Sequence, residues 1–509
     1  MDVMPQPAVP QELRDILPAS LLDIPRAAVR PQRVARASGT DQQVDTYGWD
    51  TVFAIAIPDV NRAIAGRKSS PPGFDYRDDA GHVTCQGRFG DWWVCPGGDG
   101  SNLYVALPVT AVRGSYPGAG GQNVAFTYDR LTAVVEIKLR FVPHGDAAAD
   151  PNSGTFHDLV VRSASEDPAD PVAALVRVEW ENGDVQPPLA TYVIEGAITG
   201  WCNAHLDAFA HVFATVNLNR YIDRDQWAFC NPSYTSYAYI DGATVDQSLL
   251  GVLCMTGGRT TSTNLQQISP FTIPGSSRAG FLVSQKRFLE DLVLPAIPLN
   301  WTQARVADFE IASDDQSLSL REGASVRLPD VQHGGGTYTP YLKRFTLKLE
   351  NQVIQIDAYS EVEISPGITG WCQSTHWYTV GLGRSDGGQT LVYRQYNDPV
   401  TANGHAEAPG IKVLEWMLAA LAAIVVVILG VLTDGAAFIL SALLAGLLFG
   451  VAGATPKIIE AINSDAAPSI DLLVFNGTDA IRWAGGDTFN LDYANLNRSL
   501  QLGGTPRFA

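Results

Sequence analysis

The segment from Val413 to Ala454 constrains the fold of this chain more than any other. It contains two runs without a charged residue, Trp416–Leu432 and Ala436–Ala454, separated by Thr433-Asp434-Gly435. The tripeptide has turn composition, so the pattern predicts an apolar helical hairpin that extends over residues 413–463. Burying one Leu, Ile or Val side chain gains about 1.5–3 kcal/mol, whereas a whole domain is stable by only about 5–15 kcal/mol. The rest of the protein, a lipid or a membrane must therefore cover the hairpin.

The stretch from Leu206 to Leu218 alternates between two sets of side chains and predicts a strand of thirteen residues. Small residues on its inner face leave room for a packed helix or for a lipid chain. Together with the hairpin, this strand supplies the candidate lipid-binding residues: Ala210, Val212, Ala214, Leu421, Ile424, Ile428, Phe438, Leu443 and Leu447.

Period-two alternation elsewhere predicts antiparallel sheets with one buried face. It occurs at residues 135–141, 176–180, 344–350 and 354–358. A helix is predicted from Ser284 to Leu294, with Ser284 as its N-cap and the prolines at 295 and 298 as its end. These patterns indicate an α+β protein dominated by strands.

The chain divides into three predicted regions. Residues 1–44 form a flexible tail rich in Pro and Arg, residues 45–300 a first β-rich module with the helix at 284–294, and residues 301–509 a second β-rich module with the hairpin. The tail carries four basic residues without an acidic neighbour: Arg26, Arg30, Arg33 and Arg36. They form either a patch for an anionic membrane surface or an acidic partner, or a solvated linker.

A pentapeptide occurs twice, as Ile198-Thr199-Gly200-Trp201-Cys202 and as Ile368-Thr369-Gly370-Trp371-Cys372. A histidine follows each copy, His205 and His376. One interpretation is a duplicated Cys/His metal site, which would need the two copies to meet in space because each provides too few ligands. The other is a β-corner with buried Trp and Cys. In both interpretations the repeat predicts two related β modules.

The composition excludes several classes of function. A net charge of −18 argues against nucleic acid as a partner, because phosphate binding needs a basic surface. The motifs of P-loops, zinc proteases and serine hydrolases are missing from the sequence, and we predict neither an enzyme nor a cofactor.

The N-terminus lacks the pattern of a signal peptide, which predicts a cytoplasmic protein or one secreted by another route. Cys85 and Cys95 flank an apparent hairpin and form either a disulfide or two free thiols.

Two motifs resemble a known family. Tyr47-Gly48-Trp49-Asp50 opens the expected ordered region, and Phe281-Leu282-Val283-Ser284-Gln285-Lys286-Arg287-Phe288-Leu289 lies in mid-chain. With the β-rich body and the late apolar segment, they resemble the clostridial forty-seven-kilodalton proteins encoded beside botulinum neurotoxin genes. The resemblance extends from about Thr46 to near the C-terminus.

This resemblance implies a tubular lipid-binding (TULIP-like) fold, in which strongly curved antiparallel sheets wrap around long helices and hold lipids between them. It implies no catalytic residues. The predicted function is therefore non-enzymatic binding of a lipid or another hydrophobic ligand, with other proteins of the same gene cluster as further partners. Two alternatives remain open: an accessory protein that inserts its 413–454 hairpin into membranes, and a structural or protein-interaction module without a ligand.

Overall fold

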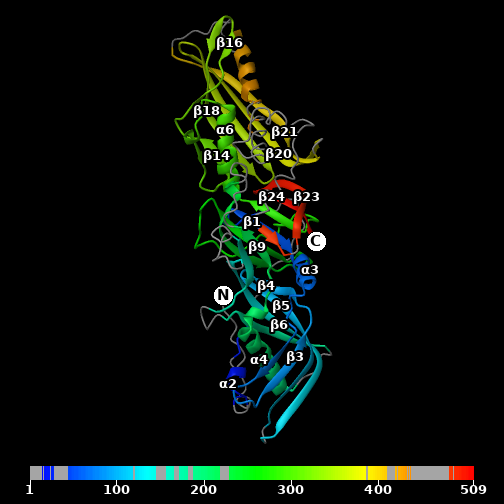
Figure 1. Cartoon of the computed structure of the whole chain (residues 1–509). Helices are drawn as coiled ribbons and strands as arrows, with labels where there is room; N and C mark the ends of the chain where they lie inside the picture. Colours follow the sequence, from blue (N-terminus) through cyan, green and yellow to red (C-terminus); the bar gives the residue numbers. More distant parts are fainter. Residues whose placement is uncertain are drawn as a thin grey trace.

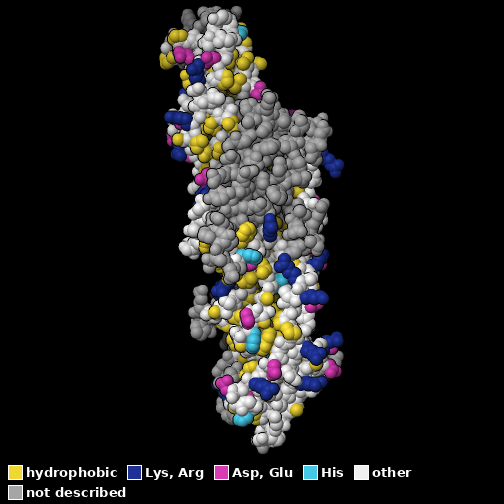
Figure 2. Space-filling view, viewed as in Figure 1, with side chains coloured by type: hydrophobic (Ala, Val, Ile, Leu, Met, Phe, Trp, Pro, Cys, Tyr) yellow, Lys and Arg dark blue, Asp and Glu magenta, His cyan; other side chains and the backbone are white. Residues whose placement is uncertain are grey.

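The protein is an elongated molecule with strands at both ends and in the middle (Figure 1). The computed structural model describes residues 14, 17–22, 24–27, 44–118, 121–144, 156–165, 171–181, 187–217, 228–385, 388–409, 419–420, 422–432, 434, 436, 439, 481–484 and 486–508. On the face shown in Figure 2, charged side chains of both signs are interspersed with hydrophobic ones along the described surface.

A 13-stranded sheet runs through the middle and the upper end of the molecule. Its main path is β10 (Pro232–Ile240), β11 (Leu249–Thr256), β1 (Thr51–Ala56), β12 (Ala279–Val283), β24 (Ser499–Phe508), β23 (Gly486–Asn497), β20 (Ile368–Ser385), β19 (Val353–Ser365), β18 (Pro340–Glu350), β14 (Ser317–Leu320) and β13 (Phe309–Ile311). In addition, β21 (Gly388–Glu407) pairs with β20, and β15 (Val326–Arg327) pairs with β18. The C-terminal strand β24 pairs with β12, so the two predicted modules share this sheet.

A 9-stranded sheet forms the lower end. Its main path is β2 (Gly73–Arg77), β3 (Thr84–Phe89), β5 (Asn102–Pro117), β6 (Asn123–Pro143), β7 (Phe156–Val161), β9 (Ala214–Asn217) and β22 (Ile481–Trp483), with β4 (Trp93–Asp99) beside β5 and β8 (Ala173–Trp180) beside β6. The helix α4 (Pro188–Ala204) contacts β2, β3, β5, β6 and β8. A separate hairpin of β16 (Val331–His333) and β17 (Gly336–Tyr338) lies at the top of Figure 1.

The remaining described elements are short. They are α2 (Ala19–Leu22), α3 (Ile57–Arg67), α5 (Gln285–Arg287), η4 (Phe288–Val293), α6 (Leu294–Asn300), and the single 3₁₀ turns η1 (Leu206–Ala208), η2 (Ala228–Cys230), η3 (Val245–Gln247) and η5 (Val306–Asp308). The prediction of antiparallel sheets is confirmed, since every strand pair between named strands is antiparallel. The four alternating stretches lie in β6, β8, β18 and β19. For β6 the prediction of a single buried face is wrong, because Glu136 and Lys138 are buried together with their apolar neighbours.

The predicted mid-chain helix begins as expected but ends later. The Ser284 hydroxyl accepts a hydrogen bond from the Arg287 N–H (3.3 Å) and caps α5. The following segment, η4, is a π-helix, in which the Leu294 N–H donates to the Leu289 carbonyl. This wider turn shifts the hydrogen-bond ladder just ahead of Pro295, so the helix continues to Asn300. The prediction that Pro295 and Pro298 terminate it is wrong.

The long strand predicted from Leu206 to Leu218 is also wrong. Its first residues form the 3₁₀ turn η1. Of the described residues between 206 and 217, only Ala214–Asn217 form a strand, β9. Phe209 and Phe213 are buried, whereas the Ala210 side chain is exposed. A phenylalanine buries far more apolar area than an alanine, so the two phenylalanines face the interior. Before β9, the face that was predicted to be buried is therefore the exposed one.

Part of the N-terminal segment packs on the body of the protein, so its prediction as a flexible tail is wrong for residues 17–22 and 24–27. Leu17, Leu21 and Ile24 are buried. The Ala27 N–H donates to the Leu175 carbonyl at 2.8 Å, which places the segment beside β8. Arg26 forms an ion pair with Glu195 of α4 and is therefore held within the fold. The other three arginines of the predicted patch, at positions 30, 33 and 36, lie outside the described residues.

The cysteines at 85 and 95 are free thiols. Cys85 lies opposite Gly114 and Cys95 opposite Tyr104, both on β5. Those two positions are ten residues apart, which is about 33 Å along a strand at about 3.3 Å per residue. A disulfide requires Cα atoms within about 7 Å, so the geometry excludes it.

Candidate ligand-binding site

The structure separates the predicted lipid-binding residues. Ala214 is buried on β9, Val212 is half-buried, and Ala210 is exposed. Ile424 and Ile428 are fully buried in a helix at the upper end, drawn in orange in Figure 1. The other four predicted positions, Leu421, Phe438, Leu443 and Leu447, lie outside the described residues.

This upper helix buries one face. Residues 422–432 are helical, and so are the described residues at 434, 436 and 439. A turn at Thr433-Asp434-Gly435 was predicted, but Asp434 itself is helical, so that prediction is wrong. The buried positions recur every three or four residues: Ala420, Ile424, Ile428, Leu432, Ala436 and Ile439. Among the described residues, no helix combines the length and hydrophobicity needed to span a bilayer.

The inner face of β19 and β20 forms a wall at the same end of the molecule. Alternate residues of both strands are buried: Ile354, Ile356, Ala358, Ser360, Val362 and Ile364 from β19, and Ile368, Gly370, Cys372, Ser374, His376, Tyr378 and Val380 from β20. The apolar members of this wall belong to the same continuous cluster of buried side chains as Ile424 and Ile428.

Three buried polar side chains of the described residues interrupt the apolar wall: Ser374 and His376 make no hydrogen bond, and Ser360 lies beside the Cys372 thiol. Ser374 and His376 are at most 1% exposed, and among the residues that the structure describes neither the Ser374 hydroxyl nor either ring nitrogen of His376 has a partner. They are two residues apart on one face of β20, so their Cα atoms are about 6.6 Å apart. Burial lowers the pKa of His376, while Asp357 acts in the opposite direction. A buried polar group without a partner costs about 1–3 kcal/mol.

The wall also contains a pair of side chains that contact each other. Ser360 on β19 lies opposite Cys372 on β20. Burial raises the pKa of the Cys372 thiol to about 11, and the Ser360 hydroxyl reduces that rise. The thiol is therefore protonated at neutral pH and adds no charge to the wall.

The metal and β-corner interpretations of the repeat are both wrong. The first copy is helical and lies in α4 at the lower end, whereas the second is extended and lies in β20 at the upper end (Figure 1). The two copies therefore cannot form one site. Across the described residues, no group of three or more His, Cys, Asp or Glu side chains could hold a metal ion. His376 could be identified from the repeat, and its inward direction follows from the alternate burial along β19 and β20.

The two motifs of the family resemblance meet in the interior near β1 and β12. The Ser284 N–H donates to the Asp50 carbonyl at 2.8 Å. Arg287 Nε lies 3.2 Å from Asp50 Oδ1, and both side chains are at most 5% exposed. Asp50 Oδ2 also accepts from Arg259 Nε at 2.9 Å. Removing one partner of a buried ion pair costs about 3–5 kcal/mol, so these motifs hold the fold together and do not form a ligand site.

With this geometry established, the comparisons with known proteins identify the family. The model described as "OrfX-like: Protein OrfX2/OrfX3/P47" matches residues 46–504. The chain belongs to the OrfX-like family. The predicted resemblance to the forty-seven-kilodalton proteins of botulinum neurotoxin gene clusters is thereby confirmed. The matched region begins at residue 46, as predicted.

Members of the OrfX-like family match nearly the whole chain. Protein OrfX3 of Paraclostridium bifermentans is 36% identical over 492 residues, which cover 91% of this chain and 98% of that protein. Protein OrfX3 of Clostridium botulinum (strain Kyoto / Type A2) is 32% identical over 91% of this chain and 99% of its own length. The solved structure of P47 from Clostridium botulinum A2 is 17% identical, with a TM-score of 0.62, and the match covers 92% of this chain and 99% of P47. At that identity, the likeness to P47 shows the fold alone.

Proposed function

We propose that this OrfX-like protein is a non-enzymatic binder of a lipid or a similar amphipathic ligand, held along the inner wall of β19 and β20. The observation that carries the proposal is the pair of polar groups, Ser374 and His376, that find no partner among the described residues in a largely apolar wall. Ligand sites are usually apolar surfaces with a few polar groups that fix orientation. A ligand head group that supplies the missing hydrogen bonds removes the cost of leaving them unmade.

The proposed arrangement is TULIP-like, with acyl chains between the curved sheet and the helix that contains Ile424 and Ile428. Ile424 and Ile428 are fully buried at the same end of the molecule as the wall (Figure 1), and this burial supports a shared groove. We further propose that the protein acts in the cytoplasm, or outside the cell after export without a signal peptide, and that its protein partners come from the same gene cluster.

The test uses delipidated full-length chain and a fluorescent fatty-acid probe. We expect saturable binding to the wild type and at least about tenfold weaker binding to His376→Leu, because leucine keeps the wall apolar but removes the polar anchor. His205→Leu, the matched change after the other pentapeptide, leaves binding unchanged. Absence of saturable binding to the wild type, or equal binding by both variants, would contradict the proposal.

A second candidate function is membrane contact by the upper helix. Its outward side exposes Val426 (69%) and Val427 (48%), and exposed neighbouring valines are suited to a lipid surface. Flotation with phosphatidylcholine–phosphatidylglycerol vesicles at neutral and acidic pH tests this function. We expect the Val426→Ser/Val427→Ser double variant to float less than the wild type. If the wild type floats at neither pH, membrane contact is eliminated, and a chain that also binds no lipid is best described as an interaction module.

A further inference from the structure

The N-terminal segment, residues 17–22 and 24–27, is bound to a surface formed by α4 and β8 at the lower end of the molecule (Figure 1). The family match begins at residue 46, so this segment lies outside the region that the chain shares with the family. The surface that it covers belongs to the shared region. A surface of the family fold is therefore occupied by a segment that precedes that fold in the sequence.

Apolar side chains attach the first half of the segment. Leu17, Leu21 and Ile24 are buried, with at most 6% of each residue exposed. Leu21 lies against Gly196 of α4, where an added Cβ would be 2.6 Å from Leu21 Cδ2 and 3.1 Å from Leu21 Cα. A side chain at position 196 would overlap the leucine, so the glycine permits this close approach. The helix α4 therefore has a notch that one leucine fills.

The second half of the segment is attached through its main chain. The Leu175 N–H of β8 donates to the Pro25 carbonyl, and the Ala27 N–H donates to the Leu175 carbonyl, both at 2.8 Å. The segment runs parallel to β8 at this point, and the opposite edge of β8 pairs with β6. Addition of an extended peptide to a sheet edge is a recurring mode of peptide recognition.

Arg26 adds a charge to these contacts. Its guanidinium forms an ion pair with Glu195 of α4 and lies 5.9 Å from the centre of the Tyr192 ring on the same helix. The Glu195 side chain is only 12% exposed. A carboxylate with so little contact with solvent needs a cation beside it, so a peptide that occupies this surface must provide one.

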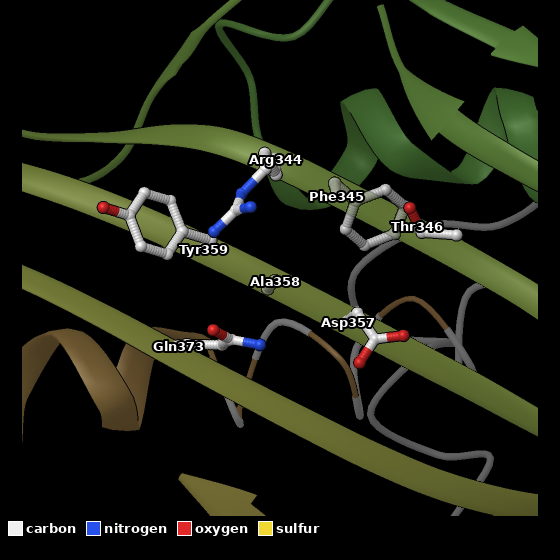
Figure 3. A pocket seen from close by; sticks show the side chains of 7 residues that line it. All are labelled: Arg344, Phe345, Thr346, Asp357, Ala358, Tyr359 and Gln373. Atoms are coloured by element: carbon white, nitrogen blue, oxygen red, sulfur yellow. The ribbon is translucent and has the colours of Figure 1, made fainter. Parts of the chain in front are cut away.

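The hollow on the outer face of the upper sheet has no comparable binding surface. Its volume is about 170 Å³, and it lies over β18, β19 and β20 (Figure 3). The Arg344 guanidinium carbon lies 4.3 Å from the centre of the Tyr359 ring, and Trp371 stacks on the same ring with centroids 6.1 Å apart. These side chains contact one another, whereas the surface of α4 and β8 is covered by a separate segment of the chain.

We propose that α4 and β8 form a docking surface for a short peptide of a partner protein, and that the N-terminal segment occupies it in the resting chain. The peptide that fits has the chemistry of this segment: apolar residues at the positions of Leu17, Leu21 and Ile24, followed by an extended stretch with a cation. A partner binds when its peptide displaces the N-terminal segment. The docking surface lies at the lower end of the molecule, whereas the proposed lipid wall lies at the upper end, so the two proposals can be tested separately.

The test uses the full-length chain with a protease site inserted between Ala27 and Val44. After cleavage, gel filtration and mass spectrometry should show that the N-terminal piece remains bound to the body. A labelled synthetic peptide of residues 14–29 should then exchange into the cut chain, as measured by fluorescence anisotropy. The uncut chain should bind this peptide at least about tenfold more weakly, because its own segment competes at a high effective concentration.

Peptide variants separate specific docking from adhesion of an apolar peptide. The Leu21→Asp and Arg26→Glu peptides should each bind at least about tenfold more weakly. The Arg14→Glu peptide is the matched control, because it makes the same change of charge at an exposed residue and should bind like the unchanged peptide. A cut chain with Glu195→Arg should prefer the Arg26→Glu peptide, and its melting curve checks that it is folded.

Three outcomes would overturn the docking surface. The first is a cut chain that loses the N-terminal piece and then binds no labelled peptide. The second is peptide binding that Leu21→Asp and Arg26→Glu leave unchanged. The third is an N-terminal piece that excess peptide displaces only when the whole chain melts, which would make the segment a permanent part of the core. Fatty-acid binding should be equal in the cut and uncut chains, which separates this result from the lipid proposal.

Discussion

The same five residues build a helix at one end of the molecule and a strand at the other. Ile198–Cys202 lies in α4, which packs against the 9-stranded sheet, whereas Ile368–Cys372 begins β20 and forms part of a sheet itself. Trp201 is buried and stacks on His205 with ring centroids 4.8 Å apart. Trp371 is half-exposed on the outer face and stacks on Tyr359. An identical pentapeptide therefore does not determine its own conformation.

The neighbouring residues account for the difference. Around the first copy, buried residues recur with helical spacing: Ala190, Val193, Ile194, Ala197, Ile198, Trp201 and Cys202. Around the second copy, every other residue is buried from 368 to 380. The period of the apolar pattern decides between helix and strand, and it also decides which groups are buried. In α4 the only polar member of the pentapeptide, Thr199, bonds to the Glu195 carbonyl at 2.8 Å, whereas Ser374 and His376 of β20 remain unpartnered.

The largest expected contrast concerns the two tryptophans. Trp201→Ala should lower the free energy of unfolding by about 3–5 kcal/mol, because it leaves a cavity between α4 and Phe89. Trp371→Ala should lower it by about 1 kcal/mol, because the lost ring is on the outer face. Chemical denaturation of both variants measures the contrast. Equal losses would show that the two copies are buried alike.

The second contrast concerns the histidines that follow the copies. His376→Leu should raise the free energy of unfolding of the ligand-free chain by about 1–3 kcal/mol, because it removes unpartnered buried nitrogens. His205→Leu should change it by less than about 0.5 kcal/mol, since His205 is exposed. Destabilisation by His376→Leu in the delipidated chain would show that the nitrogens have partners.

The same histidine predicts a pH dependence. The pKa of His376 is lowered in the folded chain from its ordinary value of 6.5, so the unfolded chain binds a proton that the folded chain excludes. This titration leaves the free energy of unfolding unchanged above pH 6.5 and lowers it as the pH falls below that value. Melting curves from pH 7.5 to 5 should therefore fall less steeply for His376→Leu than for the wild type. Parallel curves would refute this assignment.

A smaller contrast separates the two threonines. Thr199→Val keeps the shape of the side chain but removes its bond to the Glu195 carbonyl, and should cost about 1 kcal/mol. Thr369→Val changes a half-buried position in a strand, where β-branched residues are favoured, and should cost about zero. Thermal melting of the two variants provides the comparison, and a reversed order would contradict the helical assignment of the first copy.

The smallest effect is expected at the glycines of α4. An alanine Cβ at position 200 would lie 3.4 Å from Tyr76, an ordinary contact, so Gly200→Ala should stabilise the helix by about 0.5–1 kcal/mol. Gly196→Ala is the control within the same helix. Its Cβ would lie 2.6 Å from Leu21 Cδ2 and 3.1 Å from Leu21 Cα, so it should displace α2 and destabilise the chain. Stabilisation by both changes would show that α2 does not pack there.

Local patterns in the sequence predicted much of the fold and little of the site. The strands β8, β18 and β19 could be predicted because burial alternates along them, whereas β6 has the alternating sequence but is buried on both faces at residues 133–139. The helix α4 could have been predicted from the helical spacing of its apolar residues. The repeated pentapeptide suggested the same structure for both copies, although their flanking residues differ. The turn near Asp434 was predicted from composition and the long strand before β9 from alternation, whereas tertiary packing decided both.

The site depended on information that the sequence does not carry locally. His376 could be singled out because it follows the second copy, yet its lack of a partner depends on what every neighbouring strand contributes. The docking surface for the N-terminal segment depends on contacts that α4 and β8 make with residues far away in the sequence. Neither feature can be recognised in the sequence of a single segment.

Native mass spectrometry of the purified full-length chain tests the central claim most directly. We expect a mass above that of the polypeptide, with an excess that organic extraction releases as a lipid and that incubation with the same lipid restores. A chain that has only the polypeptide mass after gentle purification, and that acquires no lipid on incubation with a total lipid extract, would contradict a lipid-binding wall.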